Sequence, residues 1–102
     1  MAQSEELGFA ELFCNRLYAH AERKAKLYDG IQRTRVNTHE YVTIMTEELG
    51  EVASALIRER IPNVIAECLD LAHTAMLMVY RLDPNGDLLR HMDTFTKDMI
   101  LE

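Results

Sequence analysis

Apolar residues recur every three to four positions along most of this chain, which is the spacing of one face of an α-helix. Such patterns run from about Ser4 to Tyr28, from about Thr38 to Arg60 and from about Pro62 to Leu82, and a shorter, more polar one covers about 87–100. No stretch alternates with period two over a useful length, so no strands are predicted. The sequence therefore predicts an all-α fold of four helices in one domain, residues 1–102.

Local signals mark where these helices begin and end. Asp29-Gly30 supplies a stop of the left-handed glycine kind after the first helix. Asn37 and Glu40 have the spacing of a capping box and start the second helix. Pro62 suits the first turn of the third helix, where an amide hydrogen would have no partner, and residues 83–86 form a turn. We expect the second and third helices to pack antiparallel.

Composition and charge narrow the classes of function. The formal net charge is −6. An acidic chain lacks the cationic patch that nucleic acids and anionic membranes need, so we expect neither as a partner. The chain does not open on a secretion signal, and its most apolar stretch, residues 64–80, holds too many acids for a membrane span. A cytoplasmic location is therefore expected.

The third predicted helix carries acidic residues within an otherwise apolar stretch, where burial of a carboxylate is energetically unfavourable. Between residues 64 and 80, the only residues that are not apolar are Glu67, Asp70, His73 and Thr74. A helix that is apolar on nearly every side is typically buried. Glu67 and Asp70 lie three residues apart and so share a face of this helix.

The second helix repeats this arrangement. Glu48 lies between two apolar stripes, Glu51 follows three residues later, and Glu47 lies one turn before Glu51. The main predicted core stripe consists of Val42, Met45, Leu49, Val52, Ala53 and Leu56, and a second apolar edge consists of Tyr41, Ile44 and Ala55.

Four carboxylates beside apolar surfaces need a compensating charge. Moving one unpaired carboxylate out of water costs several kcal/mol, so either some pKa values rise or a cation lies among them. No Lys or Arg occurs at residues 36–57 or 61–80, so the two helices offer no basic partner locally. Ligands that are all oxygen select hard ions, and we expect Mg²⁺, with Mn²⁺ as an alternative.

The acids also carry a resemblance to a known family. Residues 47–51, followed by residues 67–70, resemble the ExxE…ExxD signature of the MazG-like, all-α nucleotide pyrophosphohydrolases, and the similarity extends over about residues 38–82. It implies a four-helix bundle that hydrolyses a nucleoside triphosphate to a monophosphate and pyrophosphate. It further implies that magnesium is bound by Glu48, Glu51, Glu67 and Asp70. The fourth helix lacks the Lys and Asn positions that many members use near the substrate.

Other residues are candidates for supporting roles. Glu47, outside the four-acid pattern, is a candidate base that acts from beyond the metal ligands. Lys24, Lys26 and Arg35 are candidate substrate-binding residues, although a solvated basic face explains them more simply. A chain this short has too little core to close a cleft well, so we expect a homodimer or homotetramer.

Three alternative functions remain open. Residues 67–73 also resemble a segment of the phosphoribosyl-ATP pyrophosphatases, from the same superfamily. A module that binds metal and nucleotide without turnover fits the departures in the fourth helix. A carboxylate-bridged redox metal bundle would use His73 as a ligand, although the second helix has no matching histidine.

Overall fold

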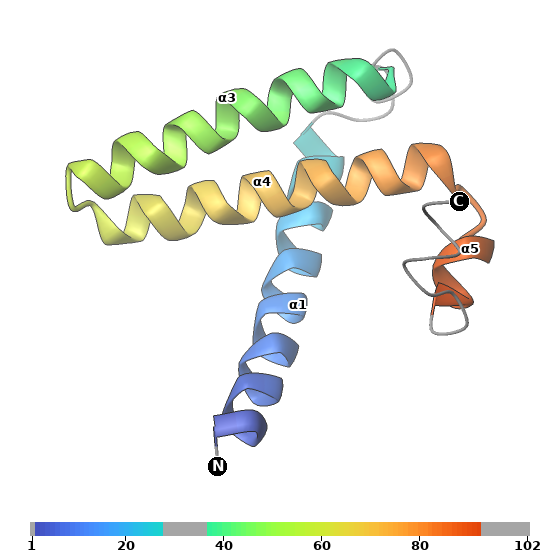
Figure 1. The fold of residues 1–102 in the computed structure, drawn as a ribbon, viewed down its shortest axis with the longest axis horizontal. Coiled ribbons are helices and arrows are strands. Elements are labelled where there is room, and N and C mark those ends of the chain that lie inside the picture. The colour runs from blue at the N-terminus through green and yellow to red at the C-terminus, as the bar shows by residue number, and fades with distance from the viewer. Residues whose placement is uncertain (1, 28–36, 93–102) are drawn as a thin grey trace, which may run out of the picture.

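The computed structural model describes residues 2–27 and 37–92. In these ranges the chain forms the helices α1 (Ala2–Leu27), α3 (Thr38–Ile57), α4 (Ile61–Leu82) and α5 (Asp87–Arg90), with no strand (Figure 1). The predicted all-α class is confirmed. The fourth helix was predicted over 87–100, whereas α5 ends at Arg90; residues 93–102 lie outside the described part.

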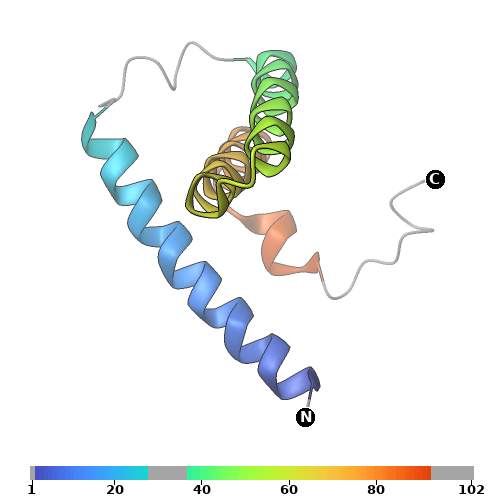
Figure 2. The same cartoon turned by 90° about the vertical axis from the view of Figure 1, so that its left-hand side faces the viewer.

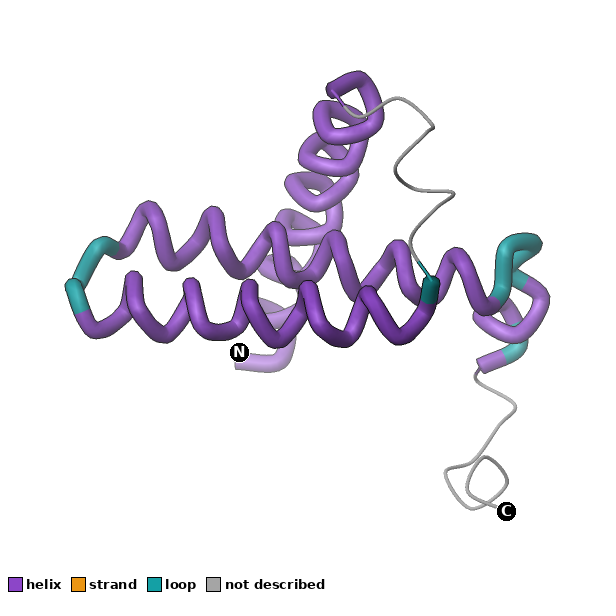
Figure 3. The backbone as a smooth tube through the Cα atoms, turned by 90° about the horizontal axis from the view of Figure 1, so that it is seen from above, coloured by secondary structure: helices purple, strands orange, loops and turns teal. Residues whose placement is uncertain are grey.

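The helices α3 and α4 form an antiparallel hairpin, and α1 lies across α4 (Figures 1 and 3). Figure 2 looks nearly along the hairpin and shows α1 on one side of it, with the N-terminal half of α1 extending away. Within the described residues, the contacts between helices are those of α3 with α4 and of α1 with α4. The predicted antiparallel packing of the two acid-bearing helices is therefore observed.

Capping contacts explain where α3 begins. The Asn37 side chain accepts a hydrogen bond from the backbone N–H of Glu40 at 2.9 Å, and its amide group donates to the Glu40 carboxylate at 2.8 Å. This exchange satisfies a backbone donor that the helix itself leaves without a partner. Pro62 lies in the first turn of α4, as its missing N–H favours.

A tight turn at residues 58–60 joins α3 to α4. The Arg60 N–H donates to the Ala55 carbonyl at 3.1 Å, and the Glu59 N–H donates to the Leu56 carbonyl at 3.0 Å, which is the Schellman pattern. Glu59 has a φ of 57°, in the left-handed region that usually takes glycine at this position. The turn places Arg58 and Arg60 at the end of the hairpin.

The single chain buries little apolar surface. Tyr41, 3% exposed, is the one buried hydrophobic residue in the described part, and three polar residues are also buried: His20, His73 and Thr74. The predicted main stripe of α3 is largely exposed, with Val42, Leu49 and Leu56 each at least half accessible. That prediction is wrong for one chain, because the acid-bearing face of α3 turns toward α4 and the stripe beside it faces away.

Candidate functional site

The four acids of the predicted metal site come together across the α3–α4 hairpin. Glu48 and Glu51 belong to α3, whereas Glu67 and Asp70 belong to α4. A side-chain hydrogen bond joins Glu67 to Glu51, and the negative charges of Asp70 and Glu48 also act on Glu67. The structure therefore places all four carboxyl groups in one interacting cluster, which we call the acid cluster.

Two members of the acid cluster hold their protons more tightly than usual. Burial is the main cause that raises the pKa of Glu48; a hydrogen bond with Thr74 opposes it, while the charges of Asp70 and Glu51 add to it. The hydrogen bond with Glu51 is the main cause that raises the pKa of Glu67, followed by burial and by the neighbouring negative charges. Crowded carboxylates favour bound protons or a bound cation.

Two oxygens of the acid cluster are buried without a hydrogen-bond partner in the described part of the chain, namely Oε1 of Glu48 and Oε2 of Glu67. Such orphaned oxygens are rare in proteins and cost about 1–3 kcal/mol each, with a higher cost for a charged group. Their hard oxygen character and their excess negative charge both fit a divalent cation such as Mg²⁺. Across residues 2–27 and 37–92, no three acid, histidine or cysteine side chains are arranged as a ready-made metal-binding group.

Helix α1 brings basic groups to Asp70. His20 Nε2 lies 2.7 Å from Asp70 Oδ1, and Lys24 Nζ lies 3.7 Å from the same oxygen. Local sequence offered no basic partner within the two acid-bearing helices, and the tertiary contact with α1 supplies two. His20 and Lys24 are four residues apart and so share one face of α1, which the sequence alone shows. The sequence could not show which helix this face would contact.

The remaining predicted residues have different positions. Lys24, a candidate for substrate binding, is half-buried beside Asp70. Lys26 is exposed on α1, and Arg35 lies outside the described residues. Glu47 is exposed on α3.

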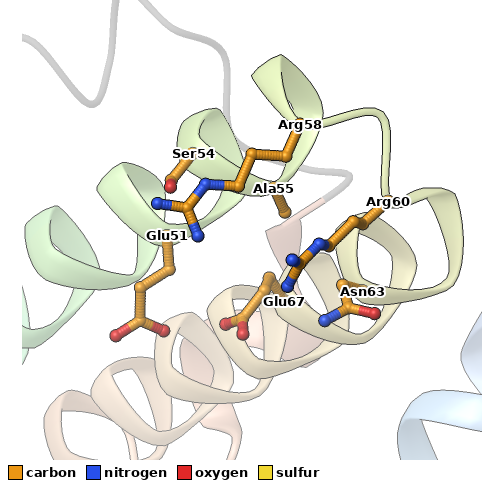
Figure 4. A pocket seen from close by; sticks show the side chains of 7 residues that line it. All are labelled: Glu51, Ser54, Ala55, Arg58, Arg60, Asn63 and Glu67. Carbon is orange, nitrogen blue, oxygen red and sulfur yellow. The ribbon is translucent and has the colours of Figure 1, made fainter.

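Beside the acid cluster, an open hollow of about 150 Å³ is lined by Glu51, Ser54, Ala55, Arg58, Arg60, Asn63 and Glu67 (Figure 4). The guanidinium group of Arg58 extends over the hollow toward Glu51, and that of Arg60 extends toward Glu67. We call this space the arginine hollow. Sequence reasoning missed both arginines, although their positions in a short turn between two acid-bearing helices were visible.

His73 and Thr74 are buried next to the acid cluster. The rings of His73 and His20 meet edge to face, with centroids 5.5 Å apart, and the Thr74 hydroxyl donates to the Asp70 carbonyl at 3.1 Å. These contacts fix the turn of α4 that carries Asp70.

Comparisons with protein-family models, with curated proteins and with solved structures gave no match for this chain. No helix in the described part is long and apolar enough to cross a membrane.

Proposed function

We propose that this chain is a magnesium-dependent nucleoside triphosphate pyrophosphohydrolase of the MazG-like kind. The observation that carries the proposal is the acid cluster, in which two antiparallel helices each contribute a buried carboxyl oxygen, Oε1 of Glu48 and Oε2 of Glu67, that has no hydrogen-bond partner among the described residues. Maintaining such a cluster costs stability, and a binding role for a divalent cation explains why the chain tolerates that cost. The residues that hold the metal are Glu48, Glu51, Glu67 and Asp70.

When bound, Mg²⁺ supplies charge neutralisation at the attacked phosphorus and lowers the pKa of a water molecule. The chain's own residues hold and orient the reacting groups. The acid cluster fixes the position of the metal. Glu47, exposed on α3 one turn before Glu51, takes the proton from the attacking water.

The arginine hollow is the proposed position of the substrate's phosphate chain. Arg58 and Arg60 share this hollow with Glu51 and Glu67, so cationic groups and metal-binding acids lie within one small space (Figure 4). Guanidinium groups donate several hydrogen bonds in a geometry that matches phosphate oxygens. Phosphates held there would lie beside Glu51 and Glu67, two of the proposed metal ligands.

A second copy of the chain covers the exposed apolar surface in this proposal. Leu7 and Phe9 on α1 are 64% and 65% accessible, and Leu49 on α3 is 58% accessible. Contact with a second copy would remove such side chains from water. Sedimentation analysis is expected to give a homodimer or homotetramer, and a stable monomer would contradict this part of the proposal.

A binding module without turnover is the second candidate function. One specific observation favours it: His20 and Lys24 already lie against Asp70, and the positive charge of Lys24 offsets part of the negative charge of the acid cluster. A module of this kind would bind metal and nucleotide but would not convert the nucleotide.

The test is to identify the products by ³¹P NMR after incubation of the protein with Mg²⁺ and a panel of ribo- and deoxynucleoside triphosphates. We expect a monophosphate and pyrophosphate from at least one triphosphate, with no turnover by Asp70→Asn. Diphosphate and inorganic phosphate would indicate cleavage of a different bond. Nucleotide binding without any product would favour the binding module.

A further inference from the structure

His20 is the residue through which α1 reaches the acid cluster. Its side chain is 8% exposed, and its Nε2 lies 2.7 Å from Asp70 Oδ1. This distance is at the short end for a hydrogen bond between nitrogen and oxygen, as expected when the acceptor is ionised. Lys24 Nζ lies farther from the same oxygen, at 3.7 Å. At this distance Lys24 contributes a positive charge but does not orient the Asp70 carboxylate through a hydrogen bond.

The partners of the His20 ring assign its tautomer. An ionised Asp70 only accepts hydrogen bonds, so Nε2 of His20 carries the hydrogen. On the other side of the ring, Arg23 Nη2 lies 3.5 Å from Nδ1. A guanidinium group only donates, so Nδ1 acts as the acceptor. His20 is therefore held with its N–H toward Asp70 and its lone pair toward Arg23.

The orientation of the ring is fixed by α4 itself. His73, three residues after Asp70 on α4, meets the His20 ring at an interplanar angle of 82°. The Thr74 hydroxyl donates to the backbone carbonyl of Asp70. The His20 ring therefore contacts the same turn of α4 that carries the Asp70 carboxylate.

We infer that His20 is a positioning residue, which holds one oxygen of Asp70 so that the carboxylate is already oriented for a divalent cation. Carboxylates that bind metals are themselves hydrogen-bonded, and loss of such a partner typically reduces metal affinity by about 10–100-fold. Helix α1, whose contact with the hairpin is confined to α4, therefore takes part in the metal site through this bond. The inference rests on the proposed role of Asp70 as a metal ligand.

Two substitutions separate this role from simple packing. His20→Gln keeps an N–H donor at nearly the position of Nε2, whereas His20→Phe keeps a ring against His73 and removes the donor. His20 borders a second hollow of about 200 Å³, lined in addition by Arg16, Ala19, Arg23 and Leu69, so either side chain has room to fit.

The experiment is a titration of each variant with Mn²⁺ alone, followed by electron paramagnetic resonance, without nucleotide. We expect His20→Phe to lose about tenfold or more in Mn²⁺ affinity and His20→Gln to stay within about threefold of the wild type. Thermal melts of the metal-free variants establish that both are folded. Equal affinity for Mn²⁺ in a folded His20→Phe variant and the wild type would overturn the inference, as would a wild type that binds no Mn²⁺.

A second measurement uses the unsubstituted protein. Long-range ¹H–¹⁵N correlation spectra of metal-free wild type are expected to show His20 with the hydrogen on Nε2 and none on Nδ1. The opposite tautomer would overturn the inference, even if His20→Phe does not fold. The two proposals fail separately: if Mn²⁺ affinity depends on His20 but no pyrophosphate is released from any triphosphate, the positioning role stands and the enzymatic function does not.

Discussion

Replacement of Glu48 by glutamine is expected to stabilise the metal-free protein, although most substitutions destabilise. Glu48 is half-buried, its Oε1 has no hydrogen-bond partner among the described residues, and burial is the main cause of its raised pKa. At pH 8 the ionised carboxylate is therefore held in an unfavourable environment beside Asp70 and Glu51. Glutamine has nearly the same shape and carries no charge.

The size of this effect follows from the cost of a buried charge. A buried polar group without a partner costs about 1–3 kcal/mol, and more when charged. Because the Glu48 side chain is only partly buried and glutamine remains polar, we expect a gain of about 1 kcal/mol in the free energy of unfolding. For a domain of about 100 residues, this gain raises Tm by roughly 4 °C.

The assay is thermal and urea unfolding at pH 8 in the presence of a chelator, at one fixed protein concentration because self-association would shift the midpoint. Glu47→Gln is the matched control, since Glu47 is exposed on the same helix and we expect its replacement to change Tm by less than about 2 °C. If Glu48→Gln lowers Tm, or changes it no more than Glu47→Gln does, then the Glu48 carboxylate does not destabilise the metal-free protein, and this interpretation of the acid cluster is refuted.

Three further predictions concern the acid cluster and the turn beside it. The folded-state pKa values of Glu48 and Glu67 lie above the ordinary 4.5, so the folded protein binds these protons more tightly than the unfolded chain does, and stability without metal should fall as pH rises above 4.5. Mg²⁺ should therefore raise Tm more at pH 8 than at pH 5 in thermal melts, and an equal rise at both would contradict this. Glu59→Gly should raise the free energy of unfolding by about 0.5–1 kcal/mol in urea melts, because φ at this position is 57°; an equal gain in Glu59→Ala would count against that cause. The double variant Arg58→Gln, Arg60→Gln should raise KM for the triphosphate about tenfold with little change in kcat. The control Arg16→Gln should leave both KM and kcat unchanged. A fall in kcat alone would argue against phosphate binding in the arginine hollow.

Much of the fold follows from local sequence signals. The capping pair of Asn37 and Glu40, the proline at position 62 and the helical periodicity fix α3 and α4 to within a few residues. These signals act over one or two turns, so sequence alone contains them. The antiparallel hairpin then follows, because a turn as short as residues 58–60 leaves two helices little alternative.

The burial pattern was harder to predict. Periodicity identified two apolar stripes on α3 but could not decide which one faces α4, and the exposed Leu49 and Leu56 show that the stripe taken as the core lies on the other side. A stripe that is apolar for contact with a second chain has the same pattern as one that is apolar for an intramolecular core. The distinction depends on tertiary structure.

The candidate site divides in the same way. The four acids were predicted from their spacing, because three-residue steps on two helices are a local property. The contact of His20 with Asp70 joins residues 50 positions apart, and no local pattern encodes it. The arginines at positions 58 and 60 were overlooked since their relation to the acids depends on how the turn folds.

The role of the acid cluster is tested by the rate of pyrophosphate release as a function of Mg²⁺ concentration. The rate is measured for the wild type, for Glu48→Gln and for Glu22→Gln, an exposed control on α1. We expect release that requires Mg²⁺, that Glu22→Gln preserves and that Glu48→Gln abolishes while the variant remains folded. Release that is independent of Mg²⁺, or that survives in Glu48→Gln, would contradict the assignment of the acid cluster as the metal site of a nucleotide pyrophosphohydrolase.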